Sequence, residues 1–118
     1  ESFTDSGEEM KLFARGDRVV AMGKTITPPA YDRVGEGVGF FKCAAAHGPL
    51  LIDCMDELLS EGNGEHEYEE ALDLLVRKVP VGWVAVDGLP WTEIDFPEDW
   101  WRGETEILPK IQQVMTCS

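Results

Sequence analysis

The first 43 residues carry short apolar-rich runs of strand length. Two of these runs, 11–15 and 18–22, are separated only by Gly16-Asp17, which predicts a β-hairpin with a tight turn. The proline and glycine residues between positions 27 and 37 predict a loop. The next run, Val38-Gly-Phe-Phe-Lys-Cys43, lacks polar alternation, so we expect a central strand that is buried on both faces.

The middle of the chain changes to helical spacing. Apolar residues recur every three to four positions over 49–59, with acidic residues between them, and Gly62 follows as a helix end. A second helix is predicted over about 65–78. Acidic residues crowd its N-terminal end and basic residues its C-terminal end, as the helix dipole favours, and Tyr68 belongs to its apolar stripe.

The last third predicts two strands and one helix. Residues 82–87 and 91–94 have strand composition. A helix over about 98–114 follows, and Pro109 predicts a break or kink in it near Leu108. The order β-β-β-α-α-β-β-α predicts an α/β fold in one domain, 1–118, with a partial mixed sheet of about five strands flanked by helices and a flexible segment at 1–9.

Composition narrows the possible functions. The apolar content of 43% in 118 residues is typical of a globular domain, and no apolar run is long enough to span a membrane. A formal charge of −13 argues against nucleic acid or an anionic membrane as partner. Residues 1–42 hold six basic and seven acidic side chains, whereas residues 43–118 hold four and sixteen, so the cations for any anionic ligand should come from the first third. Three cysteines without metal-binding spacing indicate free thiols and a cytoplasmic location.

The segment Trp91-Thr-Glu-Ile-Asp-Phe-Pro-Glu-Asp99 leads from a predicted strand into a predicted helix. Strand alternation would place Trp91, Glu93 and Asp95 on one face. A carboxylate at the end of a strand can hold a divalent cation. Asp95-x-x-Glu98 is also a capping box, in which Asp95 would begin the helix. The two roles are compatible in one aspartate, and both remain open at this point.

Three segments follow one another at fitting distances: Gly16-Asp-Arg-Val-Val-Ala-Met-Gly-Lys24, Gly35-Glu-Gly-Val-Gly-Phe-Phe-Lys42 and the motif at 91–99. Together they resemble the C-terminal half of a nucleotidyltransferase of the sugar-nucleotide type, closest to the phosphocholine cytidylyltransferase branch. The resemblance implies part of a GT-A-like fold. In this family the Gly-rich nucleotide-binding loop and the first metal-binding aspartate lie in an N-terminal half, which has no counterpart in this sequence.

The resemblance also implies roles in acceptor binding for Lys24, Glu36, Tyr68 and Glu70. Lys24 would contact the phosphate of the acceptor as the catalytic lysine, and Glu36 would lie near the acceptor pocket. Tyr68 and Glu70 resemble the aromatic and acidic pair that holds choline, with glutamate where the family has aspartate. Each residue also has an ordinary structural interpretation: Lys24 as a solvated lysine at a strand end, Glu36 as a loop acid and Tyr68 as a core residue.

In the motif at 91–99, the resemblance implies that Asp95 is the second ligand of a catalytic Mg²⁺ and that Trp91 and Glu93 line the acceptor pocket. Such transfers depend on positioning and on neutralising negative charge. The tryptophans can equally serve in packing.

The expected function is therefore the acceptor-binding and metal-completing half of an enzyme that forms a CDP-alcohol or a nucleotide-sugar from a nucleoside triphosphate and a phosphorylated alcohol. Alone it should be inactive. Its exposed sheet edge should be covered by a second copy or by a partner chain. The alternative is a non-catalytic acidic dimerisation module, and a third possibility is an unrelated small α/β protein.

Overall fold

The computed structural model describes residues 9–62 and 64–116, and the chain divides into two compact units, Glu1–Trp83 and Val84–Ser118. The fold is mixed α/β, with a three-stranded antiparallel sheet in the first unit. The segment that we expected to be flexible, 1–9, lies outside the described residues except for Glu9. Among the helices of the described residues, none has the length and the apolar character needed to cross a membrane.

The predicted hairpin is confirmed. Strands β1 (Lys11–Arg15) and β2 (Arg18–Gly23) are antiparallel and joined by Gly16-Asp17. Gly16 has φ +61°, a region that favours glycine. Its N–H donates to Asp32 Oδ2 (3.0 Å) and its carbonyl accepts from Trp83 Nε1 (3.0 Å), so the turn is held from two sides.

The third strand lies earlier in the chain than we expected. Strand β3 (Arg33–Glu36) pairs antiparallel with β1, giving the order β2-β1-β3, where the sequence predicted a loop. The strand predicted over 38–43 is not formed. Gly39 has φ +82°, which interrupts an extended run, and Phe40 is 93% exposed. The prediction of a central buried strand there is therefore wrong.

A β-bulge interrupts the pairing of β1 with β2. Phe13 faces Ala21 and Ala14 faces Val19, which leaves Val20 as an extra residue on β2. Val19 and Ala21 are buried, whereas Val20 is only partly buried. The bulge thus gives Val20 a position at the surface of this part of the sheet.

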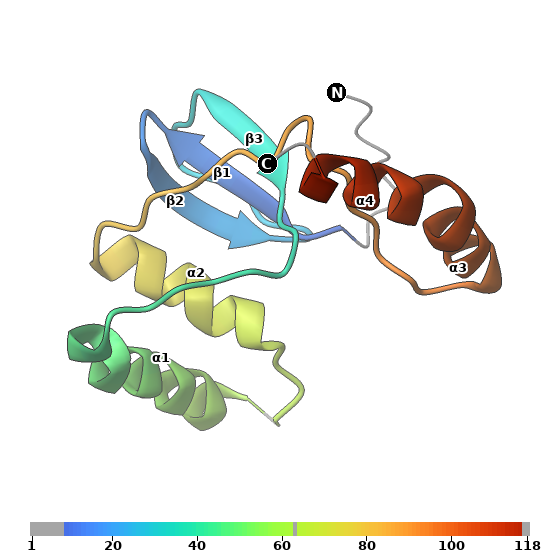
Figure 1. Ribbon diagram of the computed structural model, residues 1–118. Helices are drawn as coiled ribbons and strands as arrows, with labels where there is room; N and C mark the ends of the chain where they lie inside the picture. Colours follow the sequence, from blue (N-terminus) through green and yellow to red (C-terminus); the bar gives the residue numbers. More distant parts are fainter. Residues whose placement is uncertain (1–8, 63, 117–118) are drawn as a thin grey trace. The chain divides into compact units, whose positions relative to one another are not determined.

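Two helices build a second and a third layer on the sheet. A 3₁₀ turn, η1 (Ala45–His47), leads into α1 (Gly48–Glu61), and α2 (Tyr68–Lys78) follows. Helix α2 lies between the sheet and α1 (Figure 1). Its two sides fill two core clusters. One joins β2 to α2 and consists of Val19, Met22, Leu72 and Val76, and the other joins α1 to α2 and consists of Cys54, Ala71 and Leu75.

Both predicted helices of the first unit are present, but their apolar stripes are only partly buried. Helix α2 begins at Tyr68, three residues later than we expected, because Glu67 occupies the N-cap position. Tyr68 is 59% exposed, and Met55 and Leu59 of α1 are exposed as well. Helical spacing therefore identified the helices but not all of their buried positions.

The second unit contains one continuous helical stretch. It comprises α3 (Pro97–Arg102), a π-helical segment η2 (Gly103–Ile107) and α4 (Leu108–Thr116). The Leu108 N–H donates to the Gly103 carbonyl, five residues back. Proline lacks an N–H and crowds the preceding turn, so a wider turn directly before Pro109 relieves that conflict. The irregularity predicted near Leu108 takes this form.

The remaining two predicted strands are not formed in the described residues. Of 82–87 only Gly82 makes an isolated bridge, to Arg18, and 91–94 has no strand pairing. Val84 and Ile94 are correspondingly exposed. The described sheet thus has three strands where about five were expected. Strand alternation gives no shared face to Trp91, Glu93 and Asp95, because these residues are not in a strand.

Candidate functional site

Lys24 follows directly on β2 and reaches the start of α2. Its Nζ donates to Glu67 Oε1 at 3.0 Å, and Glu67 is the N-cap residue of that helix. Both side chains are partly exposed to solvent. The contact places the predicted phosphate-binding lysine next to the helix end that carries Tyr68 and Glu70.

A capping box organises this helix end. The Glu67 N–H donates to Glu70 Oε2 at 2.9 Å, and His66 Nδ1 lies 3.1 Å from Glu70 Oε1. The backbone hydrogen bond from Glu67, with the contact to His66, lowers the pKa of Glu70, so this group is an anion at neutral pH. Tyr68 lies between these residues with its ring exposed, so its interpretation as a core residue is wrong.

The β-sheet register brings Glu36 to the same end of the first unit. Lys11 of β1 faces Gly23 on one side and Glu36 of β3 on the other. Since neighbouring strands lie about 4.8 Å apart, the backbones of Gly23 and Glu36 are roughly 10 Å apart across the sheet. Lys24 continues from Gly23. We call this region the Lys24 end and define it by Lys24, Glu36, Glu67, Tyr68 and Glu70.

His66 is a member of this region that the sequence left unassigned. The signal that could have found it is its spacing of four residues before Glu70, which places both on one side of the helix start. Its ring also lies where a side chain on Gly62 would be, since a Cβ there would collide with His66 Nε2. Gly62 therefore leaves room for the imidazole beside Glu70.

In the second unit, Asp99 caps the final helix instead of Asp95. Asp99 Oδ2 accepts hydrogen bonds from the N–H groups of Asp95 (3.1 Å) and Phe96 (3.0 Å), and Oδ1 accepts from Arg102 (3.0 Å). These two backbone hydrogen bonds lower the pKa of Asp99. The predicted capping box of Asp95 and Glu98 is thus displaced by one residue, because Phe96 is the N-cap residue and Asp99 is the third helical residue.

The displacement leaves the Asp95 carboxylate out of the helix cap. Its side chain is exposed and makes no hydrogen bond to another described residue. Mg²⁺ often takes one or two protein carboxylates and fills its other positions with substrate phosphates and water. Asp95 fits one such position, but a lone exposed carboxylate cannot hold the ion. In 9–62 and 64–116 there is also no group of three His, Cys, Asp or Glu side chains that could do so.

The predicted site residues therefore fall into two sets. Lys24, Glu36, Tyr68 and Glu70 gather at the Lys24 end of the first unit. The others, Trp91, Glu93 and Asp95, belong to the second unit, and all three are exposed.

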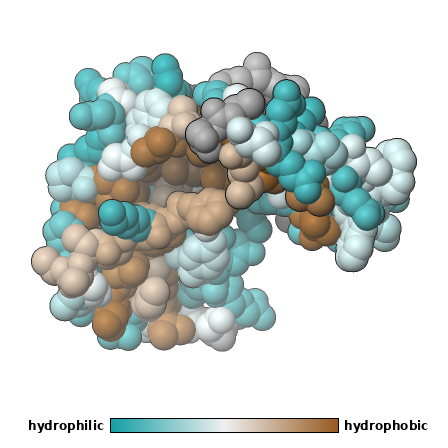
Figure 2. All heavy atoms as spheres, viewed as in Figure 1, coloured by the Kyte–Doolittle hydropathy of each residue, from teal (hydrophilic) through white to brown (hydrophobic). Residues whose placement is uncertain are grey.

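Large apolar side chains also lie at the surface. None of the residues of α3, η2 and α4 is buried, and Trp100 and Trp101 are 65% and 64% exposed. Figure 2 shows apolar side chains at the surface over α1 and α2, and on the helices of the second unit. Of the cysteines in the described residues, Cys43 and Cys54 are free thiols.

Comparison of the chain with protein-family models, with curated proteins and with solved structures gives no match. The family resemblance of the three segments therefore rests on their sequence alone.

Proposed function

We propose that this chain is the acceptor-binding and metal-completing half of a nucleotidyltransferase that forms a CDP-alcohol or a nucleotide-sugar from a nucleoside triphosphate and a phosphorylated alcohol. The three segments at 16–24, 35–42 and 91–99 support the family. The observation that carries the proposal is the contact of Lys24 Nζ with Glu67 Oε1, which gathers a cation, an exposed aromatic ring and a carboxylate at one helix end.

These groups suit a phosphorylated amino alcohol such as phosphocholine. A quaternary ammonium can lie over the ring of Tyr68, which is accessible, and beside the ionised carboxylate of Glu70. The phosphate then needs a cation, which Lys24 supplies. An exposed ion pair of this kind contributes only about 0–1 kcal/mol, so replacing this contact with Glu67 by a contact with a phosphate costs little.

Titration of the chain with phosphocholine, followed by NMR of the backbone amides, tests the acceptor site. We expect shifts at Tyr68 and Glu70 and weakening of binding by roughly tenfold in Lys24→Gln, the loss of one charge-assisted contact. Tyr68→Phe keeps a ring for the ammonium and should bind better than Tyr68→Ala. Lys42→Gln is the matched control, because Lys42 is exposed and lies outside the Lys24 end.

A nucleotidyl transfer assay with Mg²⁺, a nucleoside triphosphate and phosphocholine tests the second part of the proposal. The isolated chain should give no turnover, because Asp95 alone cannot hold the metal and the family's nucleotide-binding loop is missing from this sequence. Efficient turnover by the isolated chain would contradict the proposal that this is half of a catalytic site. The absence of phosphocholine shifts at the Lys24 end would contradict the acceptor site.

The second candidate is a non-catalytic acidic dimerisation module, which the exposed apolar side chains of the second unit favour. Both candidates require that a second copy or a partner chain covers this surface. Light scattering should therefore give a mass above the 13.1 kDa of one chain, either for the chain alone or after a partner is added. Phosphocholine binding distinguishes the two candidates, because a dimerisation module has no acceptor site and should not bind it. A monomer that stays soluble at high concentration with no partner contradicts both.

A further inference from the structure

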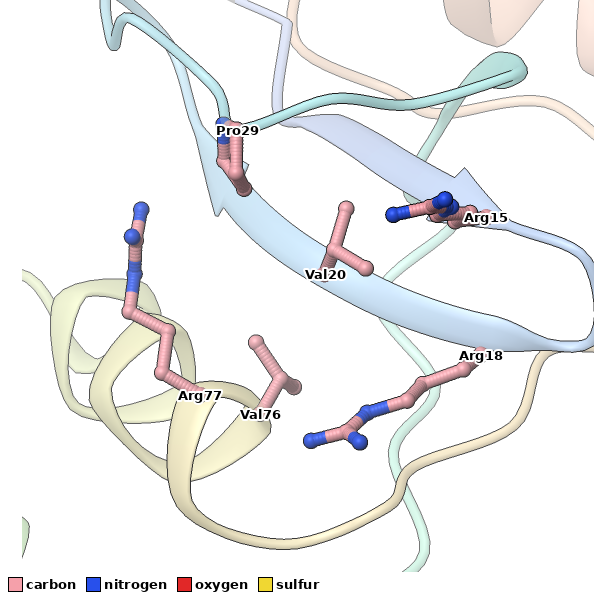
Figure 3. Close-up of a pocket in the computed structure, with 6 residues that line it drawn as sticks. All are labelled: Arg15, Arg18, Val20, Pro29, Val76 and Arg77. Carbon is pink, nitrogen blue, oxygen red and sulfur yellow. The ribbon is translucent and has the colours of Figure 1, made fainter.

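A hollow of about 340 Å³ opens between the first turn of the sheet and the C-terminal half of α2 (Figure 3). It is lined by Arg15, Arg18, Val20, Pro29, Val76 and Arg77. Three of the chain's five arginines therefore surround one cavity in a protein whose net charge is −13. This concentration of positive charge is local, since the rest of the chain is strongly acidic.

The three arginines come from three different elements. Arg15 ends β1, Arg18 begins β2 and Arg77 stands in the last turn of α2. Figure 3 shows the side chain of Arg18 extending toward α2, that of Arg15 beside the end of β1, and that of Arg77 extending from α2 on the side of Pro29, with Val20 and Val76 in the middle. A guanidinium group presents a planar fork of donors that matches oxyanions, and apolar neighbours strengthen such contacts by excluding water.

Arg77 is held in place by a carboxylate that also braces the sheet. Asp73 Oδ2 accepts from Arg77 Nε at 3.1 Å, and Asp73 Oδ1 accepts from the Met22 N–H at 2.8 Å. Because Asp73 uses only the Nε–H of Arg77, the terminal amino groups of the guanidinium keep their donors for a ligand. The bulge adds to the cavity, since it leaves Val20 as the extra residue in its wall.

Carboxylates near the arginines are few among the described residues of these elements. Asp73 neutralises one positive charge, and Asp32 is engaged with the Gly16 N–H. Asp17 lies in the exposed turn between the two hairpin arginines. Asp17 and Asp32 keep their negative charges, but no described carboxylate forms an ion pair with Arg15 or Arg18, so the guanidinium donors of these two residues are available to an anion.

We propose that this hollow binds a small, multiply charged anion of the phosphate class, such as pyrophosphate or the phosphate groups of a small metabolite. Its volume is at the lower end of the roughly 300–1,000 Å³ typical of small-molecule sites, which suits a small ligand. The arginines of the hairpin lie in the first third of the chain, where the sequence places the cations for an anionic ligand.

The hollow is separate from the Lys24 end. Arg18 begins β2 and Gly23 ends it, so five steps of about 3.3 Å put roughly 16 Å between the two ends of the strand. Along α2, Tyr68 and Arg77 are nine residues apart, or roughly 14 Å. The proposed anion site and the proposed acceptor site are therefore separate, and each can be tested without the other.

Calorimetric titration of the full chain with pyrophosphate at low salt tests the proposal, together with NMR of the methyl groups. Arg15→Gln and Arg18→Gln should each weaken binding at least about tenfold, because each removes one charge-assisted contact. Lys42→Gln makes the same change in net charge on an exposed loop and should bind within about twofold of the wild type. The methyl signals of Val20 and Val76 should shift on titration, since both residues line the cavity.

Several results would overturn the assignment. Binding that is undetectable at millimolar pyrophosphate would mean that the hollow is not an anion site. Binding that Lys42→Gln weakens as much as the arginine variants do would mean that the arginines act only through the overall charge of the protein. Citrate that binds as tightly as pyrophosphate would refute selectivity for phosphates. Lys24→Gln should bind pyrophosphate like the wild type, which separates this site from the acceptor site. Unchanged far-UV circular dichroism of the arginine variants confirms that a loss of binding is not a loss of fold.

Discussion

Replacing Asp73 with alanine removes a side chain that joins the edge of β2 to α2. Asp73 lies within α2, and its Oδ1 accepts the Met22 N–H at 2.8 Å. Met22 is only 8% exposed, so its N–H cannot find water easily once the carboxylate is gone. The other oxygen, Oδ2, is paired with Arg77 at the surface of the same helix.

The expected loss of stability follows from these two contacts. A buried donor without a partner costs about 1–3 kcal/mol, and the half-exposed pair with Arg77 contributes roughly 0.3–0.5 kcal/mol. Alanine returns up to about 0.7 kcal/mol in helix propensity. The free energy of unfolding should therefore fall by about 2 kcal/mol in Asp73→Ala. For a unit of this size, this corresponds to a decrease in Tm of roughly 8–16 °C.

Asp73→Asn is the informative companion. It keeps an oxygen for the Met22 N–H and loses only the charge, so it should cost about 1 kcal/mol or less. Urea unfolding followed by circular dichroism measures both variants, and amide exchange at Met22 reports the lost hydrogen bond directly. Asp56→Ala is the control, because Asp56 is an exposed residue of α1, and it should change stability by less than about 0.5 kcal/mol. Equal losses in Asp73→Ala and Asp73→Asn would refute the role of the backbone contact.

Three further outcomes follow from local geometry. Gly16→Ala forces a side chain into φ +61° and should destabilise the hairpin by about 1–2 kcal/mol in thermal unfolding. The hydrogen bond from the Glu67 N–H lowers the pKa of Glu70 in the folded protein. The contribution of Glu70 to the free energy of unfolding is therefore complete above its pKa in the unfolded chain and is lost as the pH falls through its pKa in the folded protein. In Glu70→Gln, the free energy of unfolding should decrease less steeply with falling pH in the acidic range. Asp99→Asn should reduce helix content more than Asp95→Asn, by circular dichroism, because Asp99 makes the cap.

Local signals predicted the elements that local interactions build. The hairpin at 11–23 follows from Gly16, whose positive φ favours glycine, and from the apolar runs beside it. Both helices of the first unit follow from their spacing and from the residues that end them. For these elements the information is contained in fewer than twenty consecutive residues.

Strands that depend on a distant partner were not predictable in the same way. The segment 38–43 is apolar, but Gly39 turns the chain and Phe40 is exposed, while β3 formed in a glycine-containing stretch with little apolar character. A strand forms where its backbone N–H and C=O groups can hydrogen-bond to a neighbouring strand. Residues Arg33–Glu36 pair with the edge of β1 that β2 does not occupy. The composition of a segment does not say which segment it pairs with.

The sequence named several residues of the candidate site, but it did not contain their contacts. The sequence pointed to Lys24, Tyr68 and Glu70 from the family resemblance, and the register and helix start bring them to one end of the first unit. The pairing of Lys24 with Glu67 joins residues 43 positions apart, which no local pattern encodes. The hollow was equally unpredictable, because its arginines come from a hairpin and from a helix more than fifty residues later.

In the motif at 91–99, the capping box lies one residue later than the sequence predicted, which changes the role of Asp95. The sequence left two roles open for Asp95, a helix cap and a metal ligand, and a carboxylate that caps a helix accepts hydrogen bonds from backbone N–H groups. The helix instead begins after Phe96, whose φ of −129° and ψ of 160° make it the N-cap residue, and Asp99 takes the N–H groups of Asp95 and Phe96. The motif therefore needs only one of its two aspartates for the fold. Since the cap does not require the Asp95 carboxylate, helix stability alone gives no reason for an acid at that position.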